Sequence, residues 1–147
     1  MHIQAKSTAA ASPANLADFL DVLARDDPNE GRLNVEGITG CGAETGGGIV
    51  FTLHHDHFEL GVARLRNAGY TVDINEDLYV EEIVPSAAGG IEAMNRPGVL
   101  AEIIRNAKDS PTANGRPIDT VLVATRTGDP GRFYVQVSFV DEPFFEV

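Results

Sequence analysis

The chain is similar to itself at a spacing of 84 residues, and this internal repeat restricts the possible folds more than any other feature of the sequence. The matching positions keep the prolines, the apolar phase of one helical segment and the apolar phase of one extended segment. We therefore expect two related units, the first at residues 1–84 and the second at residues 85–147. The matches are Pro13 with Pro97, Leu16 with Leu100, Ala17 with Ala101, Gly31-Arg32 with Gly115-Arg116, and Ile49, Phe51 and Leu53 with Phe133, Val135 and Val137.

An amphipathic helix is predicted near the start of each unit. Its apolar residues recur at i, i+3, i+4 and i+7, which places them in one stripe on the helix surface. A third helix is predicted over residues 56–68, because Asp56 and Glu59 have the spacing of a capping box and Gly69 is suited to end a helix. The stripe residues are Leu16, Phe19, Leu20 and Leu23 in the first unit, and Leu100, Ile103, Ile104 and Ala107 in the second.

Extended segments rich in β-branched residues fill most of the remaining chain. The first unit therefore has the order βαββαβ, and the second has the order βαββ. Residues that would match the remaining helix and strand of the first unit are absent, so we expect the second unit to be partial. In the first unit the predicted strands are residues 2–7, 33–38 and 49–53, and the extended segments 70–74 and 78–84 follow its second helix as the final β region. In the second unit they are residues 91–94, 118–124 and 133–139.

Residues 92–103, with the sequence EAMNRPGVLAEI, resemble the opening of an ACT domain. In that family a first strand and a short polar turn lead into a helix through Pro-Gly-x-Leu-Ala. Residues 58–70, with their Ala-x-x-x-x-x-Gly ending, are similar to the family's second helix. The resemblance implies an α+β fold, with a ferredoxin-like βαββαβ unit followed by a partial βαββ unit. It also implies antiparallel sheets with the helices on one face.

The same resemblance implies a regulatory module that binds an amino acid or a similar small molecule, acts as a homodimer and has no catalytic activity of its own. The implied binding site is the turn into the helix of the second unit, because Ala14 and Asn15 replace the Gly-x of the motif in the first. Gly98 allows a ligand to approach the backbone, and the N–H groups of a first helical turn bind a carboxylate. Arg96 could add a charge-assisted hydrogen bond. The alternative is that residues 95–98 form only a tight turn. The predicted site residues are Asn95, Arg96, Gly98, Val99 and Leu100.

The charge balance excludes some partners. The chain carries 22 acidic residues against 11 lysines and arginines, a formal net charge of −11. Such a surface repels nucleic acids and anionic membranes, and the cations do not gather in one run. We therefore expect neither partner. We also expect no membrane span, because no apolar stretch approaches twenty residues, and we predict no cofactor. Cys41 is the single cysteine, so no internal disulfide can form, and a cytoplasmic location is the simplest expectation.

The run His54-His55-Asp56-His57 contains residue types that bind zinc or nickel. If the strand continues through His55, however, His54 and His55 face opposite sides of the sheet, and Asp56 serves better as a helix cap. The sequence therefore favours a solvated corner between strand and helix. We assign no metal ligands here, and whether these histidines bind a metal is left open.

Two other functions compete with the regulatory module. One is a metal-dependent enzyme of the vicinal-oxygen-chelate type, with His55 or His57 and Glu81 or Glu82 as ligands. That enzyme requires a βαβββ order, which the helix predicted at residues 56–68 contradicts. The other is a protein-interaction module without a small-molecule ligand, which a search for bound ligand would distinguish.

Overall fold

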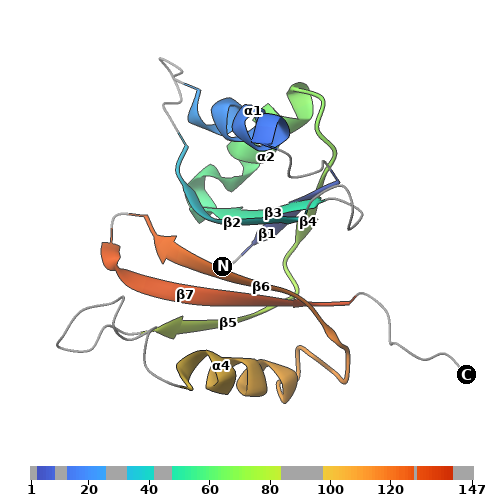
Figure 1. Cartoon of the computed structure of the whole chain (residues 1–147), viewed down its shortest axis with the longest axis vertical. Helices are drawn as coiled ribbons and strands as arrows, with labels where there is room; N and C mark the ends of the chain where they lie inside the picture. The colour runs from blue at the N-terminus through green and yellow to red at the C-terminus, as the bar shows by residue number, and fades with distance from the viewer. Residues whose placement is uncertain are drawn as a thin grey trace, which may run out of the picture. The chain divides into compact units, whose positions relative to one another are not determined.

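The computed structural model describes residues 3–8, 13–25, 33–41, 48–83, 98–127 and 129–140. The chain forms two compact units, Met1–Glu76 and Asp77–Val147 (Figure 1). Each unit contains its own antiparallel sheet. Among the described residues, none of the helices is both long and apolar enough to span a membrane.

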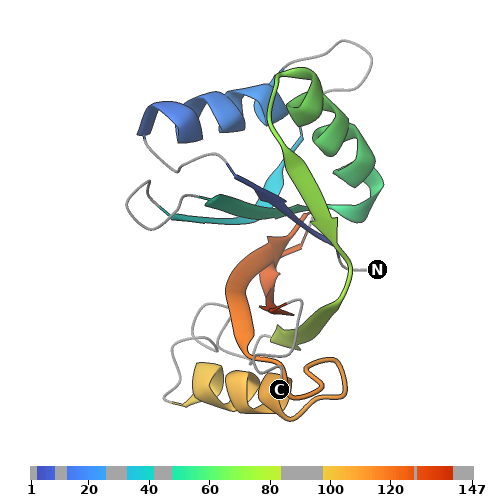
Figure 2. The same ribbon diagram turned by 90° about the vertical axis from the view of Figure 1, so that its right-hand side faces the viewer.

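The first unit has the predicted βαββαβ order. Its four strands pair in the order β2-β3-β1-β4, and every pairing is antiparallel. Figures 1 and 2 show both helices on one face of this sheet, as the fold class requires. The elements are β1 (Gln4–Ser7), α1 (Pro13–Ala24), β2 (Val35–Cys41), β3 (Gly48–Leu53), the single 3₁₀ turn η2 (His55–His57), α2 (Phe58–Asn67) and β4 (Val72–Asn75).

Aromatic rings and a close helix–strand contact hold the first unit together. The rings of Phe19 and Phe51 meet edge to face at 5.1 Å between centroids, which is a favourable aromatic geometry. Gly61 lets α2 approach β3, because a Cβ atom there would lie 2.3 Å from Leu53 Cδ1. From α2, Arg64 Nη1 donates to the carbonyl oxygens of Leu23 and Arg25, at 3.1 and 3.3 Å. These bonds satisfy carbonyls that the end of α1 leaves without helical partners.

The second unit has the predicted βαββ order, but it begins with a different strand. Its sheet has the order β5-β7-β6, and α4 lies on one face of it (Figures 1 and 2). The predicted first strand at residues 91–94 lies outside the described residues. The elements are β5 (Leu78–Ile83), α4 (Val99–Lys108), β6 (Ile118–Arg126) and β7 (Asp129–Phe139).

Strand β5 takes the place in the second sheet that β1 takes in the first. Ser7 pairs with Ile49 in the first sheet, and Ile83 pairs with Phe133 in the second. The equivalent residues Ser7 and Ile83 are 76 positions apart, whereas the equivalent residues Ile49 and Phe133 are 84 positions apart. Because the repeat at the helix also has a spacing of 84, the second unit holds eight more residues between its first strand and the matching point of its helix. The gapless repeat therefore fails before the helix. The sequence assigned residues 78–84 to the first unit, whereas the pairing of β5 with β7 puts the boundary at Glu76 and Asp77.

The apolar stripe predicted on α4 is only partly buried. Ile103 and Ala107 belong to the core of this unit, and Ile104 packs against it. Leu100 differs, since 41% of its surface is exposed. The N-terminal turn of α4 therefore presents an apolar side chain on the surface.

Candidate functional site

The N-terminus of α4 contains the described part of the predicted binding site. Gly98 is the N-cap residue, with φ 82° and ψ −6°, a left-handed conformation that favours glycine. No side chain caps the helix there. Val99 packs against the core, and Leu100 is exposed. The structure thus brings these three residues together in one turn, while Asn95 and Arg96 lie outside the described residues.

This turn offers hydrogen-bond donors that the described residues leave unused. The first amide with a helical acceptor is that of Glu102, which donates to the Gly98 carbonyl oxygen at 2.9 Å. Among the described residues, nothing accepts a hydrogen bond from the N–H groups of Val99, Leu100 and Ala101. Apart from its chain neighbours, no described residue has a heavy atom within 4 Å of a Cβ atom built on Gly98. Together with the positive end of the helix dipole, these groups can bind a carboxylate.

A cavity that the sequence did not predict lies at the opposite end of α4. Its volume is about 430 Å³, and both apolar and cationic side chains line it. Lys108 is exposed and makes no polar contact within the described part of the chain. The lining residues are Ile104, Lys108, Gly115, Arg116, Pro117 and Ile118.

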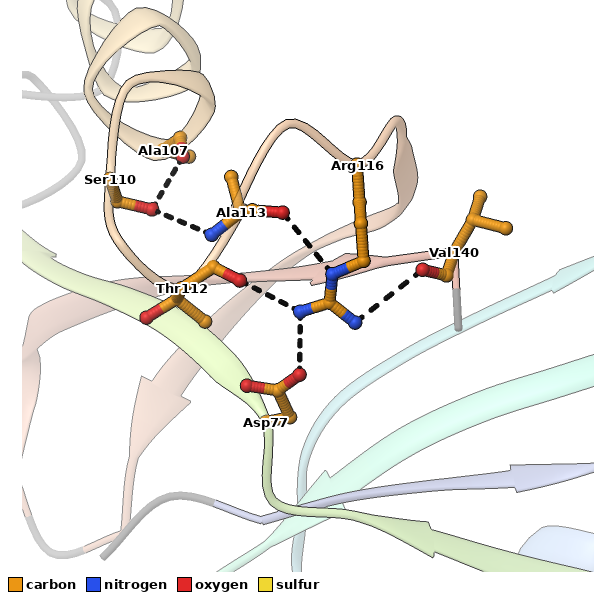
Figure 3. Close-up of polar contacts among 7 residues, drawn as sticks. All are labelled: Asp77, Ala107, Ser110, Thr112, Ala113, Arg116 and Val140. Carbon is orange, nitrogen blue, oxygen red and sulfur yellow. Dashed lines mark hydrogen bonds and ion pairs between the residues drawn. The ribbon is translucent and has the colours of Figure 1, made fainter. Parts of the chain in front are cut away.

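Arg116 stabilises the loop at residues 109–117, which forms one wall of this cavity (Figure 3). Its guanidinium donates to the carbonyl oxygens of Ala113 at 3.2 Å, Thr112 at 2.7 Å and Val140 at 3.4 Å. It also pairs with Asp77 at 2.6 Å between Nη2 and Oδ2. Because its donors face these four oxygens, we interpret Arg116 as a structural residue. The repeat marked Gly115-Arg116 by its match to Gly31-Arg32, but that match gave no indication of a cavity.

The turn before Arg116 depends on two residues with positive φ. Asn114 has φ 48° and Gly115 has φ 75°, and asparagine and glycine tolerate this region best. Ser110 supports the start of the loop, since its hydroxyl donates to the Ala107 carbonyl at 2.6 Å and accepts from the Ala113 amide at 3.3 Å (Figure 3). The loop is therefore held at both of its ends.

A polar cluster connects β5 to the middle of α4. The Tyr79 hydroxyl donates to Glu81 Oε1 at 2.6 Å, and Asn106 on α4 donates to the same oxygen at 3.1 Å. The hydrogen bond to Glu81 raises the pKa of Tyr79 to about 12, and burial and the carboxylate charge add to the effect. In the first unit, burial and a hydrogen bond to Asp18 likewise raise the pKa of Tyr70 to about 12.

Replacing Glu81 should lower the pKa of Tyr79. In Glu81→Gln the carboxylate charge is lost, so we expect the pKa to move from about 12 toward the ordinary 10.0. In the parent protein the folded state holds this proton more tightly, so the free energy of unfolding should fall as the pH rises from about 10 to about 12, and less so in the variant. Absorbance of tyrosinate during a pH titration compares the pKa of Tyr79 in the parent protein with its pKa in Glu81→Gln. Glu59→Gln in the first unit is the control, and an unchanged Tyr79 titration in Glu81→Gln would contradict the assignment.

The histidine run lies at the corner between β3 and α2, and its geometry differs from the prediction. Strand β3 ends at Leu53, so His54 and His55 do not alternate across the sheet, and their rings stack with centroids 4.3 Å apart. The predicted capping role of Asp56 is wrong. His54 caps η2, its Nδ1 accepting from the Asp56 amide at 3.2 Å, and His57 precedes α2 without a side-chain cap.

The residues proposed for the alternative enzyme do not form its fold. His55 and His57 belong to the first unit, and Glu81 and Glu82 to the second. The described elements of neither unit follow the order βαβββ. Glu82 pairs with Arg126, and Glu81 accepts from Tyr79 and Asn106. These carboxylates already have partners within their own sheet and helix.

Comparisons with known proteins identify a fold. No protein-family model matches the chain, and a search of curated proteins finds no match. Among solved structures, the ligand-free regulatory subunit of aspartate kinase from Thermus thermophilus is 19% identical, with a TM-score of 0.59 over 92% of this chain and 82% of that one. The aspartokinase alpha and beta subunits are 15% identical, with a TM-score of 0.59 over 92% of this chain and 81% of that one. The regulatory subunit of aspartate kinase from Thermus flavus is 18% identical, with a TM-score of 0.56 over 92% of this chain and 82% of that one. These likenesses confirm the α+β fold class.

Proposed function

We propose that this protein is a regulatory module of the ACT type that binds an amino acid and has no catalytic activity of its own. The observation that carries the proposal is the N-terminal turn of α4, where Gly98 has a left-handed conformation and the amides of the next three residues have no hydrogen-bond acceptor among the described residues. The likeness to regulatory subunits of aspartate kinase supports the same class of function.

The chemistry of this turn suits a zwitterion. The ligand's carboxylate would accept hydrogen bonds from the amides of Val99, Leu100 and Ala101, next to the positive end of the helix dipole. Glu102 is the acidic residue of the first turn, and it could accept a hydrogen bond from the ligand's ammonium group. Leu100 offers exposed apolar surface to the ligand's side chain. Asn95 and Arg96 complete the proposed site on sequence grounds, and Arg96 would add a second contact to the carboxylate.

A thermal-shift screen of the twenty amino acids tests this function. A ligand at 100 times its dissociation constant adds about 2.7 kcal/mol to the free energy of unfolding, enough to raise the Tm by several degrees. We expect one amino acid, or a few of related chemistry, to do so. If none changes the Tm at millimolar concentration, the protein is not an amino-acid sensor. Mass spectrometry of small molecules retained by the natively purified protein would then test for another ligand.

The proposed module acts as a homodimer in the cytoplasm. In the first sheet β4 pairs along the outer side of β1, whereas no described strand pairs along the outer side of the equivalent strand β5. Such an edge exposes unpaired backbone groups that a second copy of the chain can cover. A single cysteine suits a reducing compartment.

Light scattering measures the oligomeric state directly. We expect a mass near twice the 15.7 kDa of the chain at high micromolar concentration. A monomer over the whole concentration range would remove the dimer from the proposal, while leaving the ligand site to be tested on its own.

A further inference from the structure

The corner between β3 and α2 gathers two imidazoles and a carboxylate within bonding range of one metal ion. The metal-binding atoms of His54, His55 and Asp56 all lie within 4.8 Å of one another. Side-chain exposure is 29% for His54, 55% for His55 and 69% for Asp56, so an ion could reach them from solvent. All three residues belong to the first unit, so this site is independent of the proposed ligand site on α4.

The measured spacings approach those of a tetrahedral site. Zinc bonds of about 2.0–2.1 Å to nitrogen and oxygen place the ligand atoms about 3.4 Å apart. His54 Nδ1 lies 3.6 Å from one carboxylate oxygen of Asp56, and His55 Nε2 lies 3.2 Å from the other. The two imidazole rings stack with 30° between their planes, so side-chain rotations that end this stacking would bring the three donors around one ion. We propose that His54, His55 and Asp56 bind a late first-row divalent cation such as Zn²⁺.

The donor set selects the class of ion. Imidazole nitrogens suit zinc, copper and nickel, whereas Mg²⁺ and Ca²⁺ take oxygen ligands. Three protein ligands leave a fourth tetrahedral position for water or for a donor from another molecule. The helix that follows presents its positive end to the cation, and the Asp56 carboxylate offsets that repulsion.

Binding through His54 Nδ1 would rearrange one local hydrogen bond. That nitrogen now accepts from the Asp56 amide at 3.2 Å, and its lone pair cannot serve both partners fully. Metal binding should therefore change the environment of the Asp56 amide, and an NMR spectrum can detect that change without any assay of activity.

Calorimetric titration of the full chain, purified without a histidine tag, tests the site. We expect Zn²⁺ to bind with one-to-one stoichiometry and Mg²⁺ to give no heat. His55→Ala should weaken Zn²⁺ binding by more than about tenfold. Loss of a residue that only supports a ligand already weakens a metal site by about 10–100-fold, and His55 would be a ligand itself. Because the His55 side chain is largely exposed, this variant should keep the fold, which the Tm verifies.

His57→Ala is the matched control. Its ring lies 5.8 Å from that of His54, and it is not one of the three clustered donors. We expect its Zn²⁺ affinity to stay within about twofold of the parent, since it removes an imidazole from the same run without removing a ligand. Absence of Zn²⁺ heat at micromolar concentrations, or an equal loss in His57→Ala and His55→Ala, would overturn the assignment.

Discussion

Replacing Arg116 with alanine should destabilise the second unit by about 2–4 kcal/mol, since hydrogen bonds from charged groups and partly buried ion pairs are costly to remove. The Arg116 side chain is 15% exposed, and its loss removes the guanidinium donor from the carbonyls of Thr112 and Val140. The Ala113 carbonyl loses one of two donors, since the backbone N–H of residue 116 still donates to it at 2.8 Å. Asp77, at 59% exposed, can be hydrated and contributes less to the cost. Urea unfolding measures the loss. In amide hydrogen exchange, the loss of protection should fall in residues 109–140, while α2 should stay protected.

Two other variants distinguish the role of the guanidinium from that of its charge. Arg116→Lys keeps the charge but loses the planar set of donors, so it should recover only part of the stability. Arg105→Ala removes an exposed arginine from α4 whose side chain makes no hydrogen bond or ion pair within the described part of the chain. It should change the free energy of unfolding by less than about 0.5 kcal/mol. Equal effects from Arg116→Ala and Arg105→Ala would contradict the structural role.

Gly98→Ala should abolish the thermal response to the amino acid found in the screen. The new methyl group would stand where the ligand meets the backbone, although it would contact no side chain or backbone of the described residues beyond its chain neighbours within 4 Å. The protein itself should lose about 1–2 kcal/mol, because alanine at φ 82° adopts a strained left-handed conformation. The Tm of the variant with and without the amino acid separates these two effects.

Gly115→Ala provides a control with the same kind of strain. Gly115 has φ 75°, and an added Cβ atom there also meets nothing within 4 Å, but the residue lines the cavity at the other end of α4. We expect this variant to lose similar stability and to keep its response to the amino acid. The reverse pattern, with binding lost in Gly115→Ala and kept in Gly98→Ala, would place the ligand in the cavity.

Most of the fold could be predicted from local patterns in the sequence. Apolar spacing located both α1 and α4, because burial of one helix face imposes that period, and apolar alternation located β3 and β7. These two strands are buried more fully than the half-buried strands that alternation predicts, since every residue of β3 and residues 134–139 of β7 are buried. The first strand of the second unit was misassigned for a different reason. Strand pairing is a long-range interaction, and nothing in residues 78–83 alone shows that they pair with β7. The second unit also has eight more residues before α4, so a gapless repeat cannot align β5 with β1 and does not identify β5 as the first strand of the second unit.

The candidate sites depended more on geometry that spacing does not give. Gly98 could be predicted, because a Pro-Gly pair before an apolar helix has a local conformational meaning. The cavity beside Arg116 requires the loop, α4 and β6 to meet, and no local pattern indicates that. At the histidine corner, the expectation that disfavoured a metal site assumed a strand that continues through His55, whereas β3 ends at Leu53, as predicted, and the rings of His54 and His55 stack.

Amide chemical-shift mapping tests the central proposal most directly. When the amino acid that raises the Tm is added to ¹⁵N-labelled protein, the amide signals of Val99, Leu100 and Ala101 should shift most, because their N–H groups would receive the carboxylate. Signals from residues 113–118, around the cavity, should move little. If the largest shifts instead fall there, or if no amide of the first turn of α4 responds, the proposed binding site is wrong.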